Sequence, residues 1–146
     1  MNPMLCALAP LFLIAACSSP TKDEAIEVRD AWARATAPGQ PSGAIYATLV
    51  NHGAADDALI GAAAPSAAMA MIHTSSLVDG VARMRMVDRL AIPAGATIAL
   101  APGGTHVMLD GLGAPLVAGE QTSITLRFAT AGAKQVPVAI VAPGAR

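Results

Sequence analysis

The chain is poor in aromatic side chains and in charge. Aromatic residues make up 3% of its 146 residues, and its nine Lys and Arg residues form no cluster within a formal net charge of −1. Without basic patches or aromatic stacking platforms, nucleic acid is not expected as a partner. The short signatures of serine hydrolases, P-loop proteins and zinc proteases are also absent, so the sequence predicts a protein that is not an enzyme.

Cysteine is scarce as well, and both cysteines stand near the amino terminus. Cys6 lies in the apolar run MLCALAPLFLIAAC, whose length of about fourteen residues suits a signal peptide better than a membrane-spanning helix. The run ends in IAAC, which resembles the cleavage box of bacterial lipoproteins, where lipid is attached to the cysteine, here Cys17. The mature chain would then hold no free thiol, which excludes redox CxxC, zinc–thiolate and blue-copper sites.

These signals divide the chain into three parts. We expect residues 1–16 to be a signal peptide, residues 17–25 to be the lipidated Cys17 with a polar tether, and residues 26–146 to be a single domain. The first residues, MNPM, hold no Lys or Arg, so the signal is positively charged only at its amino terminus. We expect an exported protein that faces the periplasm and meets the membrane through its lipid alone. Ser18 after the cysteine favours the outer membrane in a Gram-negative host.

The mature domain reads as short strands separated by turn residues. In SITLRFA, Ile124, Leu126 and Phe128 alternate with polar neighbours, which is typical of a half-buried strand. No stretch keeps the 3.6-residue apolar period of a helix. Eight or nine such segments, at a spacing of roughly ten residues, predict an all-β sandwich or Greek-key barrel. The segments are 25–35, 42–51, 57–64, 68–77, 81–87, 96–101, 105–112, 121–130 and 135–142.

Soft side chains gather in one window of the mature chain. Core packing would spread methionine over every strand, yet all five methionines of the mature chain and two of the three histidines fall between residues 69 and 108. This clustering indicates a chemical role. The residues are Met69, Met71, His73, Met84, Met86, His106 and Met108.

Strand geometry brings several of them to one face. Residues two apart share a face of a strand, so His106 and Met108 project together after the Gly-Gly pair that precedes them. A turn at VDG joins segments 68–77 and 81–87 into a hairpin. If Val78 pairs with Val81 there, His73 lies opposite Met86 and diagonal to the methionine two residues earlier, Met84.

The donor set selects a metal. Thioether sulfur is soft and neutral, so it binds Cu(I) well and Zn, Mg or Ca poorly. Two imidazoles and two thioethers suit a four-coordinate Cu(I) ion, and the absence of an anionic ligand leaves that ion exchangeable. Such a site suits copper transport better than catalysis.

The spacing His73-x10-Met84-x21-His106-x-Met108 resembles the H-x10-M-x21-H-x-M motif of the PCuAC family of periplasmic copper chaperones. The flanking sequence is similar too, in segments such as DAWARATAPG, YATLVNHG and LAIPAGATIALAPGGTHVMLDGL. The resemblance therefore covers residues 27–142. It implies a cupredoxin-like β-barrel that binds one Cu(I) per chain through these four residues.

The resemblance also implies a role and a partner. It implies copper supply to the binuclear copper centre of cytochrome c oxidase, with an oxidase subunit or a Sco-like protein as the copper acceptor. Some relatives carry a His/Met-rich tail with a second copper, whereas this chain ends VAPGAR, so one site is expected. A metal-free β-sandwich lipoprotein that docks a partner, and a periplasmic copper buffer, remain as alternatives.

Residues outside the motif have less specific interpretations. Met86 is a possible additional metal contact, with packing as the favoured role. We expect Met69 and Met71 to pack in the core or shield the rim of the site. His52, in the loop VNHGAADD, is expected to be a turn residue, and Trp32 a core anchor with an Arg at its edge.

Overall fold

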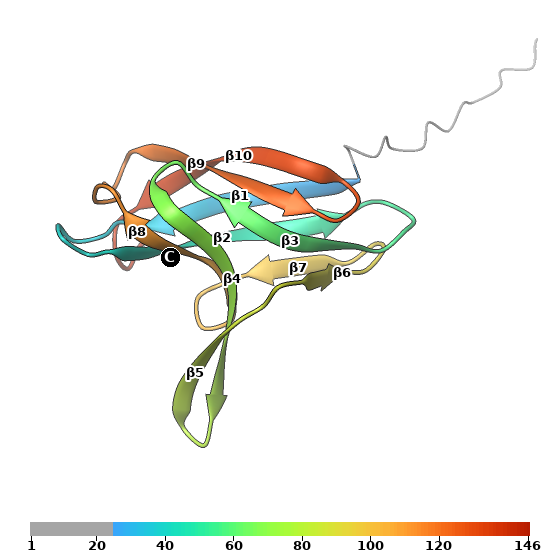
Figure 1. Ribbon diagram of the computed structural model, residues 1–146, viewed down its shortest axis with the longest axis horizontal. Helices are drawn as coiled ribbons and strands as arrows, with labels where there is room; N and C mark the ends of the chain where they lie inside the picture. Colours follow the sequence, from blue (N-terminus) through green and yellow to red (C-terminus); the bar gives the residue numbers. More distant parts are fainter. Residues whose placement is uncertain (1–24) are drawn as a thin grey trace, which may run out of the picture.

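The computed structural model describes residues 25–146, so the predicted signal peptide, Cys17 and nearly all of the tether lie outside the described residues. This part of the chain is all-β, as predicted, and forms ten strands without a helix (Figure 1). No helix in residues 25–146 therefore has the length and apolar character needed to cross a bilayer.

Nine of the ten strands coincide with the predicted segments. The short β6 was not expected, because three residues are too few to display an alternating pattern. The strands are β1 (Ile26–Arg34), β2 (Ser42–Asn51), β3 (Asp57–Ala63), β4 (Ala67–Val78), β5 (Val81–Met86), β6 (Leu90–Ile92), β7 (Thr97–Leu100), β8 (Thr105–Leu112), β9 (Gln121–Phe128) and β10 (Gly132–Val141).

Seven of these strands close into a barrel. The hydrogen-bonded order is β4-β8-β2-β1-β10-β9-β3, and β3 returns to β4 through the Ala62–Ala70 pair. The architecture is thus a barrel, with β5, β6 and β7 as additions at its edges. The outer half of β4 leaves the barrel wall with β5, and the two form a hairpin that projects from the body of the molecule (Figure 1).

Side chains along each strand point alternately to the apolar inner face of the barrel and to its outer face. Ile124, Leu126 and Phe128 are at most 2% exposed, which confirms the predicted alternation in β9. On β2 and β8, Ile45 and Val107 belong to the same core cluster. Because side chains alternate along a strand, the neighbours of these core residues must face outward, and this outer face carries the candidate site.

Asp57, at the start of β3, is a buried carboxylate that ties β3 to the turn between β9 and β10. Its Oδ1 accepts the N–H groups of Ala58 at 2.7 Å and Thr130 at 2.8 Å, and its Oδ2 accepts that of Ala131 at 2.9 Å. Burial alone would raise the pKa of Asp57, but these three donors and the charge of Arg89 outweigh it and lower the pKa. The folded state therefore favours the ionised carboxylate.

We predict that Asp57→Asn destabilises the fold by about 1–3 kcal/mol near neutral pH, because an amide offers one acceptor oxygen in place of two. The lowered pKa of Asp57 stabilises the wild type above the unfolded value of about 3.9, and this contribution is lost as the pH falls through the folded value. Chemical unfolding at neutral and acid pH measures the effect. The difference in unfolding free energy between wild type and variant should become smaller in acid. A difference that stays constant would contradict the stabilising role of the ionised Asp57 carboxylate.

Candidate metal centre

The candidate ligands come from three neighbouring strands, β5, β4 and β8. His73, in the middle strand, faces Met86 of β5 on one side and His106 of β8 on the other. Met84 faces Ser75 and is therefore diagonal to His73. The predicted hairpin register is confirmed, since Val78 pairs with Val81 around the Asp79–Gly80 turn.

His106 is held in one orientation by the loop before it. Its Nδ1 lies 3.1 Å from the carbonyl oxygen of Gly104, and the side chain is 6% exposed. An Nδ1–H that donates to this carbonyl leaves Nε2 as the nitrogen free to bind a metal. Gly103 supplies the left-handed turn, at φ +79°, and the Gly104 carbonyl also accepts the N–H of Ser75 from β4 at 3.1 Å.

His73 differs from His106 in its hydrogen bonding. Its Nδ1 is buried and has no hydrogen-bond partner among residues 25–146. The two imidazole rings meet edge to face, with centroids 6.1 Å apart. A buried polar atom without a partner costs about 1–3 kcal/mol. His73 does not line the cavity that Met84, His106 and Met108 share.

The structure separates the two methionines of β5. Met84 lines a cavity of about 370 Å³ together with His106 and Met108. Met86 is equally exposed, at 56%, but lines a different and smaller cavity beside Met71. The strand pairing alone puts Met86 closest to His73, whereas the cavity groups Met84 with the residues of β8.

Met69 and Met71 lie on the same outer face and not in the core. Met71 faces Met108 across the β4–β8 pair and is half-buried, while Met69 faces Asp110 and is largely exposed. Of the two expected roles, the structure therefore supports shielding at the rim of the site.

An aromatic layer continues from the site across the outer face of the barrel. The Tyr46 ring lies 6.2 Å from the His106 ring and 4.5 Å from the Trp32 ring. Trp32 is buried, as expected, but Arg34 is not at its edge: the guanidinium lies over the ring, 5.9 Å from its centroid. The place of Trp32 is on the outer side of the wall, however, because the adjacent Ala33 is the residue in the core cluster.

Tyr46 is a site residue that sequence reasoning did not find. It borders the same cavity as Met84 and His106. Its contact with His106 depends on the pairing of β2 with β8, which brings together segments that are distant in sequence. The one available signal was its position in an alternating strand, next to the apolar Ile45.

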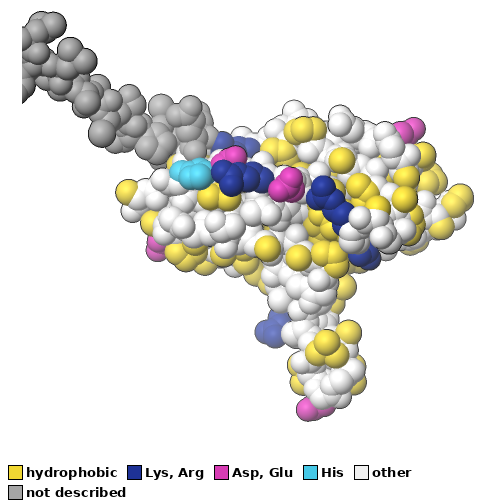
Figure 2. Space-filling view, turned by 180° about the vertical axis from the view of Figure 1, so that it is seen from behind, with side chains coloured by type: hydrophobic (Ala, Val, Ile, Leu, Met, Phe, Trp, Pro, Cys, Tyr) yellow, Lys and Arg dark blue, Asp and Glu magenta, His cyan; other side chains and the backbone are white. Residues whose placement is uncertain are grey.

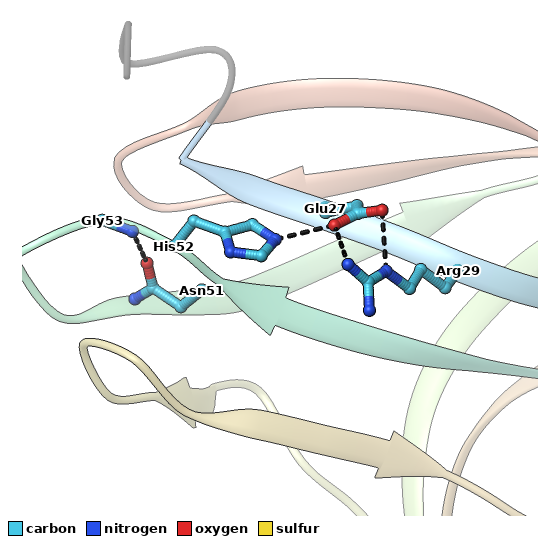
Figure 3. Close-up of polar contacts among 5 residues, drawn as sticks. All are labelled: Glu27, Arg29, Asn51, His52 and Gly53. Atoms are coloured by element: carbon cyan, nitrogen blue, oxygen red, sulfur yellow. Dashed lines mark hydrogen bonds and ion pairs between the residues drawn. The ribbon is translucent and has the colours of Figure 1, made fainter. Parts of the chain in front are cut away.

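His52 lies away from this site, at the opposite end of β2 from Ala44. Its Nε2 is 2.7 Å from a carboxylate oxygen of Glu27, which also binds Arg29 (Figure 3). Arg29, and then His52, lower the pKa of Glu27 to about 2. His52, in the segment after β2, thus belongs to an exposed ion-pair cluster.

Hard ligands do not gather in the described part of the chain. Within residues 25–146, no three His, Cys, Asp or Glu side chains are placed to hold a metal ion. The two histidines of the site would therefore need thioether sulfur to complete a coordination sphere. That donor set is soft and carries no charge of its own.

The fold matches solved structures that include PCuAC domains. The structure of the copper-bound PCuAC domain from PmoF2 aligns with a TM-score of 0.69 and 26% identity, over 82% of this chain and 94% of that one. The solution structure of apo-DR1885 from Deinococcus radiodurans aligns with a TM-score of 0.64 and 33% identity, over 99% and 98%. The Cu(I) form of DR1885 aligns with a TM-score of 0.63 and 33% identity, over 87% and 83%.

Residues 26–140 match the family model described as "Putative lipoprotein LpqE-like", and the chain belongs to this LpqE-like family of PCuAC type. A relative from Leifsonia xyli subsp. xyli, "Putative lipoprotein Lxx21020", is 35% identical over 130 residues, which cover 88% of this chain and 77% of the relative.

Proposed function

We propose that this protein is a metallochaperone that binds one Cu(I) ion through His73, Met84, His106 and Met108. The main support is the arrangement around the cavity, where two thioethers and an oriented imidazole meet beside a second imidazole, whose buried Nδ1 has no hydrogen-bond partner within residues 25–146. The likeness to the copper-bound PCuAC domain from PmoF2, at 26% identity, and to the Cu(I) form of DR1885, at 33% identity, supports the same conclusion.

The proposed ligands favour transfer over storage. None of the four is anionic, so no ligand charge holds the ion. Met84 is 56% exposed and stands on the projecting hairpin, where an incoming ligand can reach it. We assign Met86 to the rim as a possible additional contact, because it borders another cavity.

The destination of the copper rests on the resemblance to PCuAC chaperones. We propose delivery toward the copper centre of cytochrome c oxidase, with an oxidase subunit or a Sco-like protein as acceptor. A periplasmic copper buffer would use the same site without an acceptor. A metal-free docking module would not account for the grouping of two thioethers and an oriented imidazole around one cavity, which favours the metal-binding proposals.

The first test of this function is metal selectivity. The purified protein should take up one equivalent of Cu(I) in competition with a Cu(I) chelator, and it should bind Zn(II) at least about a hundredfold more weakly because thioethers are poor zinc ligands. Stoichiometry and affinity are measured under reducing conditions. Failure to take up Cu(I), or equal affinity for Zn(II), would refute the chaperone proposal.

A matched pair of variants tests the ligand assignment. Met84→Leu nearly conserves volume, so the fold should survive while most Cu(I) affinity is lost. Met86→Leu, equally exposed and two residues away, should change the affinity by less than about tenfold, or roughly 1.4 kcal/mol. Both are measured with the same competitor. If Met86→Leu lowers the Cu(I) affinity more than Met84→Leu does, the cavity that Met84 lines does not identify the methionine ligand.

We also propose that the protein is an exported lipoprotein, anchored through Cys17 and facing the periplasm. The matching family and the Leifsonia relative are both described by the words "Putative lipoprotein", which supports this proposal. Metabolic labelling with a fatty-acid analogue should mark the wild type, and Cys17→Ser should abolish the label because it removes the acylated thiol. An unlabelled wild type would contradict lipidation and would leave the copper proposal intact.

A further inference from the structure

The cavity at the metal site extends beyond the proposed ligands to a second wall. Trp32 faces Tyr46 across β1 and β2, so Arg34 and Ala44, each two residues along, share that outer face. Ala44 in turn pairs with Met108 of β8. The methyl group of Ala44 therefore stands between the guanidinium of Arg34 and the thioether of Met108. Because this side chain is small, it leaves room for the cavity of about 370 Å³.

Arg34 gives this cavity a positive wall. Among the described residues that line the cavity, it is the one with a permanent charge. One N–H of its guanidinium donates to a terminal carboxylate oxygen of Arg146 at 3.0 Å, and the group rests over the Trp32 ring. A guanidinium has five N–H donors in a fixed fork, so the remaining donors stay available to a ligand.

Arg146 brings charges of both signs to the same place. Its guanidinium lies over the Trp32 ring, 5.8 Å from the centroid, and its terminal carboxylate oxygen accepts the hydrogen bond from Arg34. The carboxylate of Asp110 is two residues farther along β8 than Met108, opposite Ser42, and does not line the cavity. A Cu(I) ion held by neutral ligands would keep its own charge and would face the Arg34 guanidinium across the cavity.

We propose that this cavity binds a small anionic Cu(I) ligand, whose carboxylate pairs with Arg34 while its soft donor is still on the copper. This inference rests on the proposed Cu(I) site and specifies the form in which copper arrives. A carboxylate relieves the repulsion between the ion and Arg34, and Arg binds carboxylates in bidentate geometry. The volume of the cavity suits a ligand of amino-acid size.

The transfer step is a ligand exchange at constant oxidation state. The bond between Cu(I) and the thiolate of the incoming ligand breaks as bonds to imidazole nitrogen and thioether sulfur of the protein form. The released thiolate leaves with its electron pair and takes a proton from water. Arg34 makes no bond to copper in this step; it positions the incoming complex and accelerates its capture.

The test compares two copper donors that differ in one group. The Cu(I) complexes of N-acetylcysteine and of N-acetylcysteine amide are mixed with the purified protein, and loss of the copper–thiolate absorption follows transfer. We expect the carboxylate-bearing donor to transfer at least about tenfold faster to the wild type, a size typical of electrostatic steering. Added salt should reduce this preference.

Variants at Arg34 separate steering from folding and from copper affinity. Arg34→Gln should abolish the preference and leave the equilibrium Cu(I) affinity within about threefold, whereas Arg34→Lys should keep the preference because it keeps the charge. Arg127→Gln removes an exposed charge on β9, outside the cavity lining, and serves as the matched control that should keep wild-type rates. Thermal unfolding confirms that each variant is folded.

Equal rates from the two donors in the wild type would overturn the inference, and so would a preference that survives Arg34→Gln. In both cases Cu(I) binding and the proposed chaperone function would stand. A wild type that accepts Cu(I) from neither donor and shows no Cu(I) affinity by competition would overturn the proposed function and this inference with it.

Discussion

The register of β4 against β5 and β8 is the constraint on which the rest of the structure depends. His73 and His106 face each other on the outer side of the wall, while Ile72 and Val107 face each other in the core. Because the side-chain period of a strand is two, a slip of one residue would exchange these pairs and bury the imidazoles. The candidate site and the hydrophobic core are thus specified by the same set of backbone hydrogen bonds.

Turns with left-handed residues hold this register in place. Asp79 and Gly80, at φ of 53° and 77°, close the β4–β5 hairpin in a geometry that matches strand twist. Just before β8, Gly103 turns the chain. The Gly104 carbonyl can then accept hydrogen bonds from Nδ1 of His106 and from the N–H of Ser75. One carbonyl therefore orients an imidazole and fastens β8 to β4, so site geometry and strand pairing are coupled locally.

The parts of the site that the sequence predicts are those with short-range causes. The hairpin register follows from the Asp-Gly turn, and the shared face of His106 and Met108 follows from their two-residue spacing. The choice of Met84 over Met86 came from the resemblance to PCuAC chaperones, because strand geometry allowed both. Tyr46 and the wall at Arg34 reach the site through the pairing of β2 with β8, which lie far apart in the sequence, and no local pattern carries that information.

Three of the proposed ligands differ clearly in how accessible they are. His106 is buried in the barrel wall and hydrogen-bonded, and Met108 beside it is half-buried. Met84 stands on the hairpin, where exposed apolar side chains continue to Leu77, which is 78% exposed (Figure 2). A rigid pair of donors on β8 can keep the ion positioned while the hairpin donor is exchanged, which is the asymmetry that a carrier of copper needs.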